Sequence, residues 1–179
     1  MTSLLDPVVE LVMNGAAALL KLFINNRTEK AELQKLLARQ QEEHATIARC
    51  WAEQGKRRSL RGFDLTGARL ANVDLVKADL VEASFRKAEL SEVNLGESNL
   101  TGADFSGAFL LGVDFSQANL NMADFRDATL RNVNFSQANL RGAGFSRAKD
   151  VTNCTWDGVY LNSQTQLNQE IRNRILYTQ

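Results

Sequence analysis

The sequence is poor in the residues that commonly build metal sites, disulfides and proline turns. Its 179 residues include one proline, one histidine and two cysteines. Cys50 and Cys154 lie far apart and match no metal-ligand spacing, which favours free thiols in a reducing compartment. With Pro7 as the single proline, the turns of this chain must come from other residues.

An excess of either charge is also absent. The chain carries 21 basic and 21 acidic residues, whereas general nucleic-acid binders show a basic excess. Direct contact with nucleic acid is therefore not expected. Residues 1–30 lack the basic start, apolar run and cleavage site of a secretory signal, so we expect a cytoplasmic protein.

Catalytic motifs are missing as well. We find no phosphate-binding glycine loop, no metal spacing and no nucleophile motif. His44 is the single histidine, and a structural role explains it best. We therefore expect a protein that is not an enzyme and that has no cofactor, metal or catalytic residues.

What the sequence does contain is a repeat of five residues. Every fifth residue from Leu60 to Phe145 is Leu or Phe, at 18 of 18 positions. From position 63 to position 143, the residue two places before each is Ala or Val with only two exceptions, Phe63 and Ser98. Five residues overshoot one helical turn, and a strand alternates every two residues. The period instead predicts a short extended piece followed by a corner, with Leu or Phe and the small residue pointing inward.

A second period of twenty residues is superimposed on the first. Val73, Val93, Val113 and Val133 are spaced by twenty, and the phenylalanines repeat at the same interval. Four repeats therefore complete one circuit and place like side chains over like. This predicts a four-sided β solenoid with coils about 4.8 Å apart and a solid interior.

The motifs Ala78-Asp79-Leu80, Ala103-Asp104-Phe105 and Ala118-Asn119-Leu120 resemble the A(D/N)LXX signature of the pentapeptide-repeat family. The resemblance covers about half of the chain. It implies a right-handed quadrilateral β-helix of about five coils, and the handedness comes from the resemblance alone. The family is abundant in bacteria, especially cyanobacteria.

The expected organisation has three parts: an N-terminal helical segment at 1–55, a β-helix at 56–162 and a C-terminal helical segment at 163–179. After Ala148 the register slips by one residue, so we expect a small bulge before Trp156 closes the last coil. Leu167, Ile171 and Ile175 recur at four-residue steps, which predicts a helix from Thr165 to Tyr177. That helix could cap the last coil or join two chains.

Two further helices are expected in the first 55 residues, at 7–24 and 28–54. The first is apolar on nearly all sides and must be covered by something. Binding to a partner or to a second copy is the favoured interpretation, ahead of packing on its own chain and of membrane attachment through residues 4–24, which are marginal in length for a bilayer.

The candidate partner-binding residues come from these helices and from departures from the repeat. Phe109 and Leu111 occupy outward positions beside Leu110, and exposed apolar clusters often mark contacts. Arg86 and Arg126 form a basic stripe that could meet an acidic partner, although a merely solvated face is the favoured interpretation. The helical candidates are Val8, Val12, Leu19, Phe23, Leu33, Leu37 and Trp51.

We therefore expect a non-catalytic scaffold or assembly module whose helical arm docks to a protein partner or larger complex. The alternative is a DNA mimic that binds a topoisomerase such as gyrase, as quinolone-resistance members of the family do. DNA carries about one charge per 1.7 Å, but the repeat from Leu60 to Asp150 has 12 acidic and 10 basic residues. This near-neutral balance disfavours the alternative.

Overall fold

The computed structural model describes residues 59–177 and nine separate positions between Ala31 and Ala48. Those nine positions are helical. The helix expected at 7–24 and the candidate residues Val8, Val12, Leu19, Phe23, Leu33, Leu37 and Trp51 lie outside the described residues. His44 lies outside them too.

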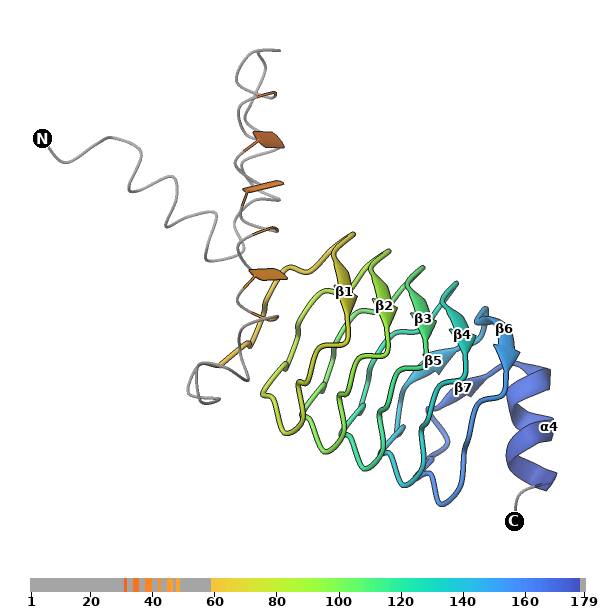
Figure 1. Cartoon of the computed structure of the whole chain (residues 1–179). Coiled ribbons are helices and arrows are strands. Elements are labelled where there is room, and N and C mark those ends of the chain that lie inside the picture. Colours follow the sequence, from red (N-terminus) through yellow and green to blue (C-terminus); the bar gives the residue numbers. More distant parts are fainter. Residues whose placement is uncertain are drawn as a thin grey trace, which may run out of the picture. The chain divides into compact units, whose positions relative to one another are not determined.

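From Ser59 onward the chain winds into a four-sided β solenoid (Figure 1). One wall is a five-stranded parallel sheet in the order β1-β2-β3-β4-β6. Its strands are β1 (Arg69–Ala71), β2 (Glu89–Ser91), β3 (Phe109–Leu111), β4 (Thr129–Arg131) and β6 (Lys149–Thr152). The register Leu70↔Leu90↔Leu110↔Leu130 confirms the circuit of twenty residues.

The other three walls are held by single parallel bridges at the same interval, such as Asp64↔Ser84, Asp74↔Asn94 and Asp79↔Asn99. All 18 Leu and Phe positions from Leu60 to Phe145 are at most 1% exposed. The prediction that this column and the small residues before it fill the interior is therefore confirmed for the solenoid.

Two aromatic stacks from opposite walls meet inside the solenoid. Phe105 stacks on Phe125 with ring centroids 4.9 Å apart, and Phe115 stacks on Phe135 at 5.3 Å. The two stacks touch edge to face, with Phe105 and Phe115 5.4 Å apart. Both geometries are favourable for aromatic rings, and the rings fill the interior of the coils that contain them.

The expected bulge is present between β4 and β6. Thr129 pairs with Lys149, twenty residues on, whereas Arg131 pairs with Thr152, twenty-one residues on. Trp156 is then buried against Phe135, as predicted for the closing coil.

The C-terminal helix is shorter than expected. Gln166–Leu167 form β7, which pairs in parallel with β5 (Gly144–Phe145), and α4 runs over Gln169–Tyr177. The solenoid therefore continues to residue 167 and not to 162, because Leu167 takes the next place in the Phe145 column.

Helix α4 begins at a capping residue and lies at the C-terminal end of the solenoid (Figure 1). The side-chain oxygen of Asn168 accepts the N–H of Ile171 at 2.9 Å, and its amide donates to the carbonyl of Ala148 at 3.0 Å. Ile171 and Ile175 are buried in the same apolar cluster as Trp156. The helix thus covers the last coil, which a solenoid needs at its ends.

Candidate protein-binding surface

Three walls of the solenoid use their outward Asp and Asn residues to build corners. The side-chain oxygen of each accepts the backbone N–H two residues on, as from Ser106 to Asp104 at 2.8 Å, Ser116 to Asp114 at 2.9 Å and Gly96 to Asn94 at 3.1 Å. Because these side chains hold the turns, they cannot be exchanged freely for recognition.

The same residues also link neighbouring coils. Asn139 donates to Asn119 at 3.0 Å, and Asn134 donates to Asp114 at 2.9 Å, each across twenty residues. Ladders of this kind stiffen two of the three walls and occupy their polar groups.

The fourth wall, formed by β1–β4 and β6 and here called the sheet wall, is built differently. The positions that carry Asp or Asn elsewhere hold other residues on this wall, namely Arg69, Glu89, Phe109, Thr129 and Lys149. Regular strand pairing replaces the side-chain turn. The outward side chains of this wall are therefore not needed for the corner that follows.

Phe109 and Leu111 stand side by side on the sheet wall. Phe109 is 37% exposed and Leu111 is half-buried, although both are large and apolar. Gly107 and Gly112 occupy the corners on either side of β3, in the left-handed region at φ +67° and +65°, where glycine is least strained. The side chains that extend over these two corners are Lys87 and Glu92 of the preceding coil.

A hollow of about 320 Å³ lies next to this pair, over β1 and β2. Its floor is Leu70 and Leu90, with the small residues Ala71 and Ser91 on one side. The Arg69 and Glu89 side chains, which form an ion pair at 3.0 Å, line the other side. Phe109 and Leu111 close the hollow toward β3.

The basic stripe lies elsewhere and is largely neutralised. Arg86 pairs with Asp104 at 3.3 Å, and Arg126 binds Asp124 through Nε at 2.9 Å. Burial opposes ionisation of Asp124, but hydrogen bonds from the Arg126 side chain and backbone outweigh it and lower the pKa of the carboxyl. The structure does not bring either arginine together with Phe109, since they belong to a different wall.

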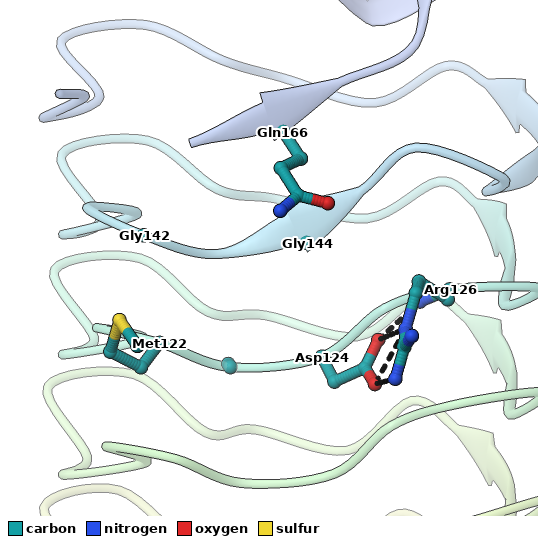
Figure 2. Close-up of a pocket in the computed structure, with 7 residues that line it drawn as sticks. Met122, Asp124, Arg126, Gly142, Gly144 and Gln166 are labelled. Atoms are coloured by element: carbon teal, nitrogen blue, oxygen red, sulfur yellow. Dashed lines mark hydrogen bonds and ion pairs between the residues drawn. The ribbon is translucent and has the colours of Figure 1, made fainter. Parts of the chain in front are cut away.

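A second, smaller hollow of about 190 Å³ lies beside Asp124 (Figure 2). It arises because Gly142 and Gly144 carry no side chains, whereas the preceding coil carries Met122 and Asp124 at these positions. Met122 and Gln166 border it in Figure 2. Its lining is polar and the Asp124 carboxylate is already bound by Arg126, so it is the weaker candidate.

Reactive groups are few in the part of the chain that the structure describes. Burial raises the pKa of the Cys154 thiol, which disfavours the nucleophilic thiolate. Among the described residues, no three His, Cys, Asp or Glu side chains are placed to hold a metal ion. The described helices include none that is long and apolar enough to cross a membrane.

Ala71 and Ser91 are functional candidates that the sequence analysis missed. Small residues at outward positions looked unremarkable one at a time. The signal that was available is the absence of Asp and Asn from every fourth repeat, because it marks the sheet wall as the one without side-chain turns.

Comparison with protein families then identifies the chain. The model of the pentapeptide repeat region matches residues 78–169, which is 92 of 179 residues. The chain belongs to the pentapeptide-repeat family. No curated protein matches it.

Among solved pentapeptide-repeat structures, HetL from the cyanobacterium Nostoc sp. strain PCC 7120 is similar, with 30% identity and a TM-score of 0.56. HetL is described as involved in the regulation of heterocyst differentiation. The similarity covers 60% of this chain and 44% of HetL, so this chain spans less than half of that relative.

Two other pentapeptide-repeat structures match less well. Rfr23 from the cyanobacterium Cyanothece 51142 is 28% identical, with a TM-score of 0.37 over 59% of this chain and 65% of its own. QnrB1, a plasmid-mediated fluoroquinolone resistance protein, is 12% identical, with a TM-score of 0.31 over 66% and 85%. Neither likeness carries a functional argument for this chain.

Proposed function

We propose that this protein is a non-catalytic binding module that recognises a protein partner through the sheet wall. The observation that carries the proposal is the pair of exposed Phe109 and half-buried Leu111, beside a hollow on the one wall whose side chains are not used in turns. Protein interfaces are enriched in aromatic anchors that fill or border such hollows.

The solenoid suits this role because it is rigid. Its backbone is paired from coil to coil, and its interior is filled by stacked rings. A surface that is already ordered loses little conformational entropy when a partner binds. The sheet wall therefore acts as a pre-formed template, and the protein serves as a scaffold.

The segment at 1–55 is proposed as a second contact. Its apolar sequence at 7–24 requires cover, and a partner, a larger complex or a second copy of the chain would supply it. We place the protein in the cytoplasm on the same sequence grounds.

The DNA-mimic alternative is not supported by the charges on the solenoid. At least seven of its twelve acidic residues from Leu60 to Asp150 form ion pairs, namely Asp79, Glu89, Glu97, Asp104, Asp124, Asp127 and Asp150. Paired acids do not present the continuous negative rows that a DNA mimic needs. A supercoiling assay with gyrase should show no inhibition at micromolar protein.

The proposed function is tested by affinity capture from cells that produce the protein. The full chain should retain a defined partner, and the double variant Phe109→Ser with Leu111→Ser should lose most of it. Met122→Ser is the matched control, because Met122 is 59% exposed but lies on another wall. Equal capture by the double variant and the control would refute the sheet wall as the contact.

A further inference from the structure

We propose that the hollow over β1 and β2 receives one large apolar side chain of a partner segment, and that a lysine or arginine next to it in that segment meets Glu92. This inference rests on the proposed function and names the chemistry of its partner.

The hollow is shaped for a single apolar side chain. Its volume of about 320 Å³ is large enough to admit one large side chain from a partner. The floor is formed at Leu70 and Leu90, and the outward side chains of Ala71 and Ser91 are too short to fill the space. An entering Leu, Met or Phe would remove apolar surface from water on both partners, at about 25 cal/mol per Å².

The borders of the hollow have different chemical characters. Phe109 and Leu111 form an apolar border toward β3, and the Cζ of Arg131 lies 5.9 Å from the Phe109 ring centroid on its far side. Arg69 and Glu89 form a second border, where each charge is balanced by the other. Neither border therefore favours a positive over a negative residue next to the apolar side chain of the partner.

The corner next to the remaining side of the hollow holds Glu92, which does not itself line the hollow. The border on this side is formed by the short side chains of Ala71 and Ser91, and the residue after Ser91 is the corner residue Glu92. The carboxylate of Glu92 extends along the solenoid into the space that a side chain on Gly112 would fill, directly after Leu111. Among the described residues it has no hydrogen-bond or ion-pair partner.

The opposite corner carries Lys87, whose side chain extends toward Gly107. Lys87 lies two residues before Glu89 of the lining, whereas Glu92 directly follows Ser91, and its carboxylate lies over Gly112, the residue directly after Leu111. A cation that follows an anchored apolar residue therefore finds an unpaired carboxylate, and an anion at the same place is repelled. This charge arrangement favours a segment with an apolar residue beside a basic one.

The test uses the full chain, labelled with ¹⁵N and titrated with three acetylated and amidated pentapeptides. Their sequences are Gly-Gly-Leu-Lys-Gly, Gly-Gly-Leu-Glu-Gly and Gly-Gly-Ala-Lys-Gly. We expect the Leu-Lys peptide to shift the amide signals of Ala71, Ser91 and Leu111 and to bind at least threefold more tightly than either other peptide.

Two variants separate the anchor from the charge. Ser91→Leu should fill the hollow and abolish the shifts, while Glu92→Gln should keep them but remove the preference for Leu-Lys over Leu-Glu. Met122→Ser should behave like the unmodified chain. Absent or diffuse shifts, shifts that survive Ser91→Leu, or a preference that survives Glu92→Gln would each overturn the proposal.

The result remains distinguishable from a failure of the proposed function. If the peptides fail while Phe109→Ser with Leu111→Ser still loses its captured partner, the sheet wall binds protein but not by this chemistry. If sedimentation shows a dimer that Ser91→Leu dissociates, a second copy occupies the hollow and the proposal is wrong.

Discussion

Phe135 and Trp156 stack with ring centroids 4.5 Å apart and planes 12° from parallel, although 21 residues separate them. Every earlier step of this column spans twenty. The bulge between β4 and β6 takes up the extra residue. The aromatic column therefore continues in line, although the spacing along the chain changes from 20 to 21 residues. Side-chain stacking, and not chain length, sets where the last coil lies.

Trp156 brings a cost that the phenylalanines before it do not. Its Nε1–H is buried and has no hydrogen-bond partner, and an unsatisfied buried donor costs about 1–3 kcal/mol. We expect Trp156→Phe to change the free energy of unfolding by less than about 1 kcal/mol, because the lost packing is offset by removal of that donor. Urea denaturation measures the difference, and a loss above about 2 kcal/mol would contradict the explanation.

Phe105 and Phe109 form a matched pair for testing the interior. Phe105 is fully buried and touches three other rings, whereas Phe109 is 37% exposed on the sheet wall. Phe105→Ala should cost about 3–5 kcal/mol of stability, which is the range for deleting a buried ring. Phe109→Ala should cost less than about 1 kcal/mol in the same denaturation experiment; similar losses at both positions would show that the inside and outside were assigned wrongly.

Gly144 interrupts a column that is polar in the coils before it. A Cβ at this position would meet the Asp124 carboxylate at 3.7 Å, an ordinary contact, and the φ of Gly144 is not in the left-handed region. We expect Gly144→Asn to raise the free energy of unfolding by about 0.5–1 kcal/mol, since it reduces the freedom of the unfolded chain and adds a ladder hydrogen bond. Gly144→Ala is the control for the first effect alone. A less stable Asn variant would mean that the small hollow is needed as it is.

The ion pair of Asp124 and Arg126 should make stability depend on pH. Because the folded pKa of Asp124 is lowered, its ionised form stabilises the fold at pH values above the ordinary pKa of about 3.9. This contribution is lost as the pH falls below that value through the folded pKa. Asp124→Asn should flatten the loss of stability between about pH 5 and pH 3, as followed by thermal unfolding.

Arg126→Gln is the companion variant for that experiment. It removes the guanidinium that lowers the pKa of Asp124 and leaves the burial that opposes ionisation. The pKa of Asp124 should therefore rise, and the acid transition should move to higher pH. An unchanged profile in both variants would show that other carboxyl groups dominate acid unfolding.

The architecture could be predicted from sequence because each position of the repeat has one physical role. Leu110 and Phe115 must point inward, and spacing alone places Leu110 between Leu90 and Leu130. The first insertion was visible because Trp156 fell one place out of phase. A second extra residue, which places Leu167 22 residues after its strand partner Phe145, was not visible, since Leu167 fits both a helical stripe with Ile171 and the solenoid column.

The candidate site could be predicted only in part. Phe109 and Leu111 were visible as apolar residues at outward positions, but the hollow depends on what Ala71 and Ser91 leave unfilled. The role of Glu92 could not be predicted from the sequence, because it depends on the direction of the Glu92 side chain, which extends over Gly112. Arg86 and Arg126 looked like a stripe in the sequence, but each has an acidic partner in space.

The different construction of the sheet wall bears on how such a protein changes over generations. A substitution at Asp104 or Asn119 alters a corner and risks the coil, whereas one at Glu89 or Thr129 alters only the outer surface. Duplicating a block of twenty residues adds one more exchangeable row at a fixed height of about 4.8 Å. New binding specificity can thus be acquired one coil at a time on the sheet wall, while the other three walls maintain the fold.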